Sequence, residues 1–433
     1  MIVLVVVPDY ASHWYPMSAV AGTLHLRGHR VIVATGWALA PLVAAAGLEH
    51  VELTLGSGSN AGVRPSGRES EIEAFLAATR EGMIATLTYQ AERRRQDLLW
   101  EPRSVAARLG DIIAGTAPDS VLVDQLAFNA TAALRGLHVP FLSFLPGHPC
   151  QLPGPGEPFG FPALRPPGFA TEPALRSLRE LCTRVASEFT AAYNAATTAL
   201  DPTAAPLDDA FAAGGTLGTL VNYPRQIGAH RSRLPHASFL GSCIRGEEPS
   251  PLFESLARRQ RSRPRVYVSL GSFLSARSDV LQRIADAIQS LGWDAVMATG
   301  VARPRLLDST PAGWVVEEQV PQVAALQACD VVVCHGGNNT VTEALTAGLP
   351  VLAAPFSTDQ FAGAEDLRRG GLGDVIDPSA ATSDEIASRL TVLLDGDAAP
   401  RAAALGGELR RSPGAGLAAD LLEAAAVAPA VAA

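Results

Sequence analysis

The strongest constraint on the fold is an alternation of short apolar runs with helix-like segments, which occurs in both halves of the chain. Met1–Val7 is a β-branched run without apolar–polar alternation, a pattern typical of a buried parallel strand. A helix-like segment, Pro16–Leu26, follows, and Gly28 separates it from a second apolar run at Arg30–Ala34. This order predicts a βαβ unit, because parallel strands need a crossover connection.

The alternation continues and then restarts in the second half. Further strands and helices are expected at Ser120–Val123, Phe128–Leu137, Phe141–Phe144, Arg265–Leu270, Asp279–Leu291, Trp293–Ala298, Trp314–Glu317, Asp330–Cys334 and Val351–Ala354. At 433 residues the chain also exceeds what one hydrophobic core usually serves. We therefore expect an α/β protein with two Rossmann-like, doubly wound domains.

Composition shifts along the chain suggest where these domains begin and end. The N-terminal domain is expected at residues 1–225, followed by a linker at residues 226–264, where Pro, Arg, Ser and Gly dominate. The C-terminal domain is expected at residues 265–400, and an alanine-rich helical tail at residues 401–433.

Charge and composition exclude several classes of function. A net charge of −9 argues against a nucleic-acid partner, because phosphate backbones require basic surfaces. The absence of lysine excludes a Walker-type phosphate loop, a pyridoxal phosphate Schiff base and a lysine nucleophile. No apolar run approaches the roughly 20 residues of a membrane span, and the five scattered cysteines fit buried thiols in a reducing compartment. We expect a cytoplasmic protein; the sequence does not indicate its oligomeric state.

Polar and glycine residues gather directly after the expected strands of both halves. In open α/β sheets, ligands bind beyond the carboxyl ends of the strands. The residues at these positions are His13, Asp124, Gly271, Ser272, the string HGGNN at 335–339, and Asp359 with Gln360. We therefore expect a functional edge in each domain.

The string HGGNN opens a helix-like segment. Gly336 and Gly337 allow close approach of a backbone, and the helix start offers free N–H groups and a positive dipole end, which together bind anions such as pyrophosphate. His335 can add a donor, whereas the carboxylate of Glu343 suits a vicinal diol better than a phosphate. The alternatives are structural: Thr340 and Glu343 have the spacing of a capping box, and the glycines can form a tight turn.

The complete string is more specific than its parts. H-G-G-N-N-T-x-x-E at 335–343, P-x-x-x-D-Q at 355–360 and V-P-Q at 320–322 resemble the donor signature of family-1 nucleotide-sugar glycosyltransferases. The similarity is continuous from Trp314 to Gly373, and a weaker one covers most of the rest, including the opening βαβ unit. The resemblance implies the GT-B fold, in which two Rossmann-like domains face each other across a cleft and the C-terminal domain binds the activated sugar.

The resemblance also implies a role for each matching position. Val320 and Gln322 would flank the base and ribose, and Gly271 with Ser272 would line the phosphate side. The residues that would hold the pyrophosphate are His335, Gly337, Asn339 and Thr340. Glu343 would bind the ribose hydroxyls, and Asp359 and Gln360 the hydroxyls of the sugar. Asn338 is assigned to the donor site without a defined role, because relatives often carry another residue there.

His13 and Asp124 form the candidate catalytic pair. A hydroxyl nucleophile must lose its proton as it attacks, histidine titrates near neutral pH, and a carboxylate on the far ring nitrogen fixes the tautomer. In the resembled family the matching residues are the general base and its partner, although relatives usually have Gly-His where this chain has Ser12-His13. Taken singly, each residue is also consistent with a capping or packing role.

The acceptor is expected in the N-terminal domain. Trp14 and Tyr15 are candidate acceptor-binding residues, and the segments Gly56–Ser70, Met83–Gln90 and Phe144–Phe161 have the mixed polarity that suits a small natural product, as in antibiotic biosynthesis. No D-x-D motif follows an expected strand, so we expect neither a metal nor a cofactor beyond the nucleotide-sugar co-substrate.

These observations predict an inverting glycosyltransferase that transfers a hexose to a small-molecule acceptor, with His13 as general base. UDP-hexose is the expected donor, because Glu343 gains less from a thymidine diphosphate sugar, which lacks the ribose 2′-hydroxyl. Three alternatives remain open: a dTDP-deoxysugar enzyme that can form C- or N-glycosides, a UDP-sugar 2-epimerase of the same fold, and an inactive auxiliary protein.

Overall fold

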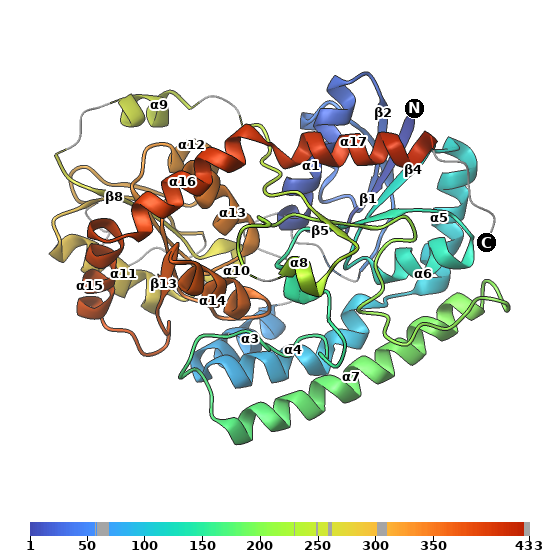
Figure 1. Ribbon diagram of the computed structural model, residues 1–433, viewed down its shortest axis with the longest axis horizontal. Coiled ribbons are helices and arrows are strands. Elements are labelled where there is room, and N and C mark those ends of the chain that lie inside the picture. Colours follow the sequence, from blue (N-terminus) through green and yellow to red (C-terminus); the bar gives the residue numbers. More distant parts are fainter. Residues whose placement is uncertain are drawn as a thin grey trace.

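The computed structural model describes residues 1–56, 58, 69–228, 230–247, 250–258, 262–300 and 310–427. In this part the chain forms two parallel β-sheets with helices packed around each (Figure 1). The predicted pair of doubly wound α/β domains is therefore confirmed.

The N-terminal sheet has seven strands in the order β3-β2-β1-β4-β5-β6-β7. They are β1 (Ile2–Val6), β2 (Arg30–Thr35), β3 (Glu49–Glu52), β4 (Ser120–Asp124), β5 (Leu142–Leu145), β6 (Thr219–Val221) and β7 (Ala237–Phe239). The helices of this half are α1 (Ala11–Leu26), α2 (Ala40–Ala45), α3 (Glu69–Glu81), α4 (Met83–Leu98), α5 (Pro102–Thr116), α6 (Phe128–Gly136), the 3₁₀ turn η1 (Pro149–Gln151), α7 (Glu172–Thr198) and α8 (His230–Arg233).

The C-terminal sheet has six strands in the order β10-β9-β8-β11-β12-β13. They are β8 (Arg265–Ser269), β9 (Asp294–Ala298), β10 (Val315–Glu317), β11 (Val331–Cys334), β12 (Val351–Ala353) and β13 (Gly373–Val375). The helices are α9 (Pro251–Arg258), α10 (Gly271–Leu274), α11 (Ser278–Ser290), α12 (Gln322–Leu326), α13 (Asn338–Ala347), α14 (Gln360–Gly370), α15 (Ser383–Asp395), α16 (Ala398–Arg411) and α17 (Gly414–Val427).

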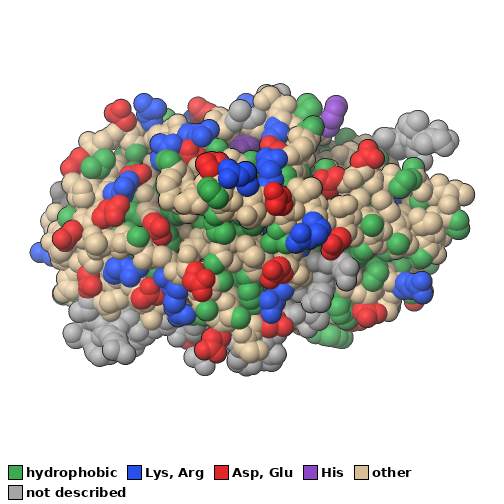
Figure 2. All heavy atoms as spheres, turned by 90° about the horizontal axis from the view of Figure 1, so that it is seen from below, with side chains coloured by type: hydrophobic (Ala, Val, Ile, Leu, Met, Phe, Trp, Pro, Cys, Tyr) green, Lys and Arg blue, Asp and Glu red, His purple; other side chains and the backbone are tan. Residues whose placement is uncertain are grey.

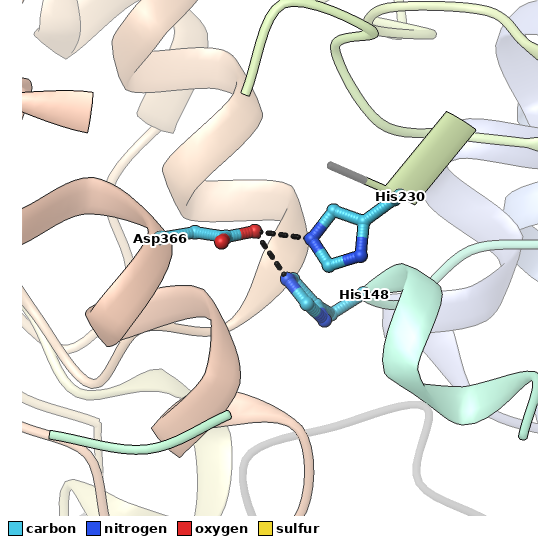
Figure 3. Close-up of side chains that lie close together, drawn as sticks. All are labelled: His148, His230 and Asp366. Atoms are coloured by element: carbon cyan, nitrogen blue, oxygen red, sulfur yellow. Dashed lines mark hydrogen bonds and ion pairs between the residues drawn. The ribbon is translucent and has the colours of Figure 1, made fainter. Parts of the chain in front are cut away.

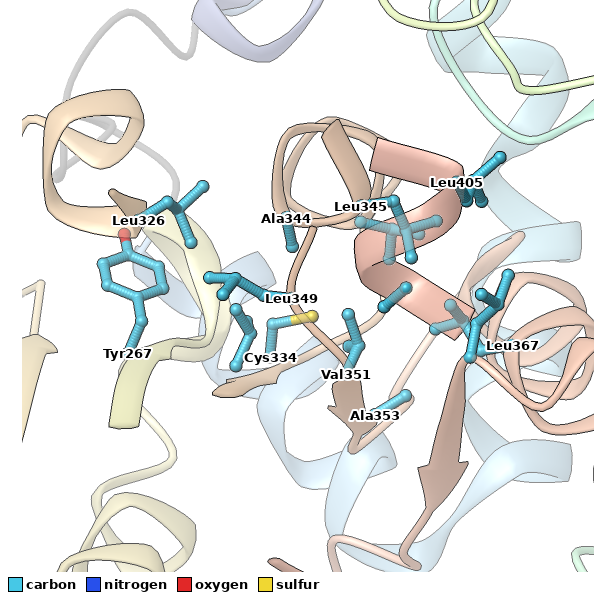
Figure 4. Packing of buried hydrophobic residues seen from close by; sticks show 14 of the residues in the cluster. Tyr267, Leu326, Cys334, Ala344, Leu345, Leu349, Val351, Ala353, Leu367 and Leu405 are labelled. Carbon is cyan, nitrogen blue, oxygen red and sulfur yellow. The ribbon is translucent and has the colours of Figure 1, made fainter. Parts of the chain in front are cut away.

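Both faces of each sheet are buried, which explains why the strands are apolar without alternation. In β1, Val3 and Val5 face one hydrophobic core while Leu4 and Val6 face another. The C-terminal sheet is likewise placed between two cores. One of them surrounds β11, where Cys334 lies among side chains of α12, α13, α14 and α16 (Figure 4).

The expected start of the first long helix is wrong. The helix begins at Ala11, not at Pro16, because the N–H of Trp14 already donates to the carbonyl of Tyr10, at 3.0 Å. Pro16 lies inside α1 and has no N–H to donate to the carbonyl of Ser12 four residues earlier. That carbonyl is therefore left without an intrahelical donor.

The linker and the tail are more structured than predicted. Residues 237–239 lie inside the expected linker, yet they pair with β6 as the last strand of the N-terminal sheet. The tail forms two helices, and α17 crosses back to lie beside α1 of the N-terminal domain (Figure 1). Arg27 contacts Asp420 and Glu423 at this junction. Helix α17 therefore joins the two domains.

The molecular surface is mixed in charge. On the face seen in Figure 2, arginine and acidic side chains are interspersed over the described residues. None of the helices in the described part of the chain has both the length and the apolar character that a membrane crossing requires. Of the cysteines, Cys182, Cys243, Cys329 and Cys334 are buried thiols and Cys150 is half-buried, as the sequence predicted.

Replacing Leu422 by alanine should destabilise the protein through the α17 contact. Leu422 is fully buried against the N-terminal core, and a cavity at such a site costs about 2–5 kcal/mol of unfolding free energy. Urea denaturation followed by circular dichroism measures the change. Leu417, on the same helix but 39% exposed, provides the control, and Leu417→Ala should cost under about 1 kcal/mol. Equal effects of the two substitutions would contradict the proposed docking of α17.

Candidate active site

The first candidate site lies where the strand order of the N-terminal sheet reverses. His13 is in the first turn of α1, directly beyond β1, and Asp124 is the last residue of β4. The two strands are neighbours, with Val6 opposite Val123, so the fold brings together residues 111 positions apart. The Nδ1 atom of His13 lies 2.8 Å from Oδ2 of Asp124. The structure thus places the predicted pair in direct contact.

Electrostatics favour a basic imidazole at this position. Burial of the ring opposes the charged form of His13, but the charge of Asp124, its hydrogen bond and the charge of Asp359 outweigh it and raise the pKa of His13. Asp124 is fully buried, and its Oδ1 atom accepts the N–H of Leu126 at 2.8 Å. This carboxylate therefore holds the proton of His13 on Nδ1 and leaves Nε2 as the basic atom.

The second candidate site lies at the corresponding reversal of the C-terminal sheet, between β8 and β11. Gly271 follows β8, and His335 follows β11. A Cβ atom on Gly271 would lie 3.0 Å from Cε1 of His335, and one on Gly337 would lie 2.3 Å from Nε2. Both positions therefore require glycine so that the imidazole can lie between the two backbones.

His335 has the properties of a neutral hydrogen-bonding group. Burial lowers its pKa to about 4, against a smaller opposing effect from a hydrogen bond to the backbone of Ser269. Its Nδ1 atom is buried and has no hydrogen-bond partner among the described residues. A buried polar atom without a partner carries a desolvation cost that a bound ligand can relieve. The ring has one N–H when neutral, so a phosphate oxygen can accept from His335 only in the tautomer that places this proton on Nδ1.

Glu343 does not form the capping box that its spacing permits. Helix α13 begins at Asn338 with Gly337 as its N-cap, so Thr340 lies inside the first turn. The carboxylate of Glu343 instead accepts Nε2 of Gln322 at 2.6 Å and pairs with Arg245 at 3.0 Å. Burial raises the pKa of Glu343, and these two partners oppose that effect. The carboxylate therefore points into the predicted ribose site, where both of its oxygens already have partners.

Arg245 is a site residue that the sequence did not reveal. It lies in the segment predicted as a linker, and its guanidinium is 4.0 Å above the ring of Tyr15. Its second contact, at 2.6 Å, is with Glu247. The charge pattern RGEE at 245–248 is the only sequence signal of this contact. Arg245 thus links a candidate acceptor residue to the candidate ribose carboxylate.

The two asparagines of the HGGNN string join the domains. The amide Nδ2 of Asn338 donates to the carbonyls of Pro146 and Asn222, at 2.6 and 2.8 Å. Asn339 donates to the carbonyl of Ser12 at 2.6 Å, the same carbonyl that Pro16 leaves without a donor. Asn338, whose role the sequence left undefined, is thus an interdomain contact in the structure.

The predicted sugar-binding pair divides into two environments. Asp359 accepts the backbone N–H of His148 across the domain boundary, at 2.7 Å. Gln360 is buried, and its Oε1 atom accepts the N–H groups of Phe356 and Ser357 at 3.0 and 3.1 Å. Gln360 therefore shapes the loop before α14, and Asp359 is the member of the pair that faces the other domain.

The structure places the remaining predicted site residues in different environments. Trp14 is only 2% exposed and lies in the N-terminal core, so its assignment to an acceptor pocket is wrong. Tyr15 is half-buried beneath Arg245. Val320 packs at the edge of the C-terminal core, and Thr340 donates to Gln322 at 3.3 Å. The Ser272 side chain and most of the Gly56–Ser70 segment lie outside the described residues.

Comparison with known proteins agrees with this geometry. Residues 219–401 match the family described as UDP-glucoronosyl and UDP-glucosyl transferases. The match lies mainly in the C-terminal half and covers less than half of this chain. The fold of the chain is GT-B, and the spinosyn rhamnosyltransferase SpnG, solved in complex with thymidine diphosphate, has a TM-score of 0.66 at 21% identity, covering 97% of this chain and 100% of that one.

One curated relative matches nearly the whole chain. Zeaxanthin glucosyltransferase of Pseudescherichia vulneris is 28% identical over 403 residues, which is 89% of each protein. The NDP-glycosyltransferase YjiC of Bacillus licheniformis is 29% identical over 165 residues. That second match spans 37% of this chain and 41% of the relative.

The two site histidines should titrate in opposite directions from free histidine. In NMR spectra of the imidazole Cε1–H groups, His335 should remain neutral from pH 8 to pH 6 and titrate near pH 4, because it is buried. His13 should titrate above its ordinary value of 6.5, because Asp124 and Asp359 stabilise its charged form. Spectra of His13→Gln and His335→Gln assign the two signals. A pKa of His335 above that of His13 would contradict the electrostatic description.

Proposed function

We propose that the protein transfers a hexose from a nucleotide sugar to a small-molecule natural product, with inversion at the anomeric carbon and with His13 as general base. The observation that carries the proposal is the His13–Asp124 contact at 2.8 Å, on the edge of the domain that faces the HGGNN motif. One named relative is a zeaxanthin glucosyltransferase, and SpnG has also been solved in complex with a spinosyn aglycone, so small natural products are the acceptors that we propose. We expect the reaction to take place in the cytoplasm.

In the proposed mechanism, Nε2 of His13 takes the proton of the acceptor group as this group attacks C1 of the sugar. The C1–oxygen bond to the β-phosphate breaks on the opposite face, and the nucleoside diphosphate leaves. Asp124 stabilises the imidazolium that forms. The N–H groups at the start of α13 and the His335 ring are placed to stabilise negative charge on the leaving phosphate. No metal is assigned a role in this scheme.

We propose UDP-hexose as the donor because the carboxylate of Glu343 lies in the predicted ribose site. An ionised carboxylate offers about four acceptor positions, so Glu343 can accept ribose hydroxyls in addition to Arg245 and Gln322. A second candidate is a thymidine diphosphate sugar. Both oxygens of Glu343 already have hydrogen-bond partners in this structure, and this favours a thymidine diphosphate sugar. A 2′-deoxyribose has one hydroxyl fewer to donate to the carboxylate.

Removing the base should abolish turnover without preventing donor binding. His13→Ala should reduce kcat by about 10²- to 10⁴-fold, the usual contribution of a general base. Mass spectrometry of the glycosylated product measures turnover, and calorimetry with the nucleoside diphosphate measures binding. His25 is an exposed histidine on the same helix, and His25→Ala is the control. Near-normal turnover of His13→Ala would refute its assignment as general base.

Asp124→Asn should also shift the pH dependence. Asp124 raises the pKa of His13, so its neutral replacement should lower this pKa. The limb of the kcat/KM profile that rises with pH, on which His13 loses its proton, should then move to lower pH. The maximal rate should fall as well, because the imidazole loses the partner that orients it. If the rising limb of the kcat/KM profile stays at the same pH in Asp124→Asn, this limb does not report the titration of His13.

Donor selection can be tested at Glu343. Wild-type protein should bind UDP about tenfold more tightly than dTDP, a difference of about 1.4 kcal/mol. Glu343→Ala should reduce the affinity for UDP by a similar factor and that for dTDP by less. Glu385→Ala, on the exposed face of α15, is the control. Equal affinity of the wild type for both nucleotides favours the dTDP donor.

The products formed with and without an acceptor distinguish the remaining alternatives. A UDP-sugar 2-epimerase would convert the nucleotide sugar in the absence of any acceptor. An inactive auxiliary protein would bind the nucleotide without transfer. Incubation with UDP-glucose alone, followed by a panel of aglycones, separates both from the proposed transferase.

A further inference from the structure

A buried polar cluster joins the two domains beside the predicted sugar site. His148 precedes η1, Tyr223 follows β6, and His230 begins α8, whereas Asp366 lies on α14 of the C-terminal domain. All four side chains are at least nine-tenths buried, with exposures of 2%, 1%, 8% and 3% in that order. The nucleotide-sugar signature includes none of them, and they come from four separate segments.

All three partners of Asp366 donate to the same carboxylate oxygen. Its Oδ2 atom lies 2.9 Å from Nε2 of His148, 2.5 Å from Nε2 of His230 and 2.9 Å from the hydroxyl of Tyr223. Figure 3 shows the two imidazoles approaching this oxygen from different segments of the N-terminal half. Burial opposes the ionised form of Asp366, but the hydrogen bonds from the two histidines outweigh it and lower its pKa. An ionised carboxylate thus holds three segments of the other domain.

The protonation of His148 identifies the cluster as a hydrogen-bonded clamp. Its Nδ1 atom accepts the backbone N–H of Cys150 at 3.1 Å, so in the neutral ring the proton is on Nε2 and points at Asp366. Burial lowers the pKa of His148 and keeps the ring neutral. The ligand atoms of His148, His230 and Asp366 lie within 4.8 Å of one another, a spacing compatible with a metal. A protonated Nε2 has no lone pair for a cation, and this argues for hydrogen bonding.

The same loop contacts the predicted sugar carboxylate. The backbone N–H of His148 donates to Oδ2 of Asp359 at 2.7 Å. Asp359 is the N-cap of α14, seven residues before Asp366, so the two acids lie about two turns apart on one side of this helix. His148 is therefore held twice by α14, through its ring by Asp366 and through its main chain by Asp359.

We propose that His148, anchored by Asp366, is a positioning residue that orients Asp359 toward a hydroxyl of the donor sugar when the two domains are joined. The inference rests on the proposed function, in which Asp359 binds the sugar. If the ring loses its anchor, the loop at 146–151 shifts and the N–H of His148 leaves Asp359. The carboxylate then keeps the Thr358 hydroxyl on Oδ1 but loses the contact that fixes Oδ2. Helix α13 contacts this loop through the Asn338 side chain and the Pro146 carbonyl, whereas the His335 ring lies against Gly271 and Gly337. The sugar should therefore lose much more affinity than the nucleotide.

The test compares a nucleotide with its sugar conjugate. Isothermal titration of UDP and UDP-glucose, or of dTDP and dTDP-glucose, gives the ratio of their dissociation constants for each variant. His148→Ala should weaken binding of the nucleotide sugar about tenfold and change binding of the bare nucleotide less than about twofold, with a matching rise in the donor KM. His148→Gln can still donate to Asp366 and should restore the wild-type ratio within about threefold.

Two further variants keep the test decisive. Tyr223→Phe removes one of the donors to Asp366 Oδ2 and so weakens the anchor of the His148 loop without removing the imidazole. It should shift the ratio about two- to fivefold even if His148→Ala fails to fold. His29→Ala breaks a histidine–carboxylate pair, with Glu423, on the far junction between α17 and the N-terminal domain, and should leave the ratio unchanged.

The outcomes separate this inference from the proposed function. If the wild-type protein binds neither nucleotide nor nucleotide sugar, the proposed function fails. If it binds both, the inference is overturned by an unchanged ratio in His148→Ala and Tyr223→Phe, by equal losses for both ligands, or by a His148→Gln variant as impaired as His148→Ala. About one equivalent of metal per wild-type chain, absent from His148→Ala, would replace the clamp with a metal site.

Discussion

The reversal of strand order in a parallel sheet is the constraint on which both candidate sites depend. On either side of the reversal the connections leave on opposite faces, so neighbouring strand ends are left open to a ligand. In the N-terminal sheet this gap lies between β1 and β4 and receives His13 and Asp124. In the C-terminal sheet it lies between β8 and β11 and receives Gly271 and His335. The same feature of sheet topology thus brings together the His13–Asp124 pair in one domain and the proposed phosphate site in the other.

In this structure, polar groups of the predicted donor site form hydrogen bonds with other groups of the protein. Asn338 and Asn339 bind backbone carbonyls of the other domain, Glu343 binds Arg245, and Asp359 binds the N–H of His148. These contacts satisfy buried groups that would otherwise be costly. A substrate must therefore exchange its own hydrogen bonds for existing ones, and the net affinity reflects the difference between the two sets. In the proposed function, domain contact and donor binding would use the same atoms.

The sequence predicted those features that depend on local pattern. Continuous apolar runs predicted the strands, and residues that follow strands predicted the His13–Asp124 contact, because parallel strand ends meet at one edge. Trp14 was misassigned because an aromatic residue beside a catalytic loop has the same sequence signal whether it faces the core or the ligand. The prediction for α1 erred in the same way: a proline usually marks a helix start, but here it lies one turn inside.

The sequence contained no pattern that predicts contacts between loops far apart in the chain. Arg245 and the partners of Asp366 come from segments without periodicity, and their meeting depends on how the two domains dock. Single polar residues in a Pro- and Gly-rich stretch are indistinguishable from loop residues until the tertiary structure is known. The capping-box spacing at Thr340 failed for a related reason, because the N-cap is set by the turn at Gly337, which carries no capping side chain.

The proline inside α1 has a consequence for the contact between the domains. An ordinary residue at position 16 would tie up the Ser12 carbonyl within the helix, and Asn339 would then have to compete for it. With proline there, the contact between the domains uses an acceptor that the helix does not need. The helix therefore needs no backbone hydrogen bond from this carbonyl, whether or not Asn339 binds it. His13, the residue after Ser12, thus lies on a helix whose own hydrogen bonds do not compete with the contact between the domains.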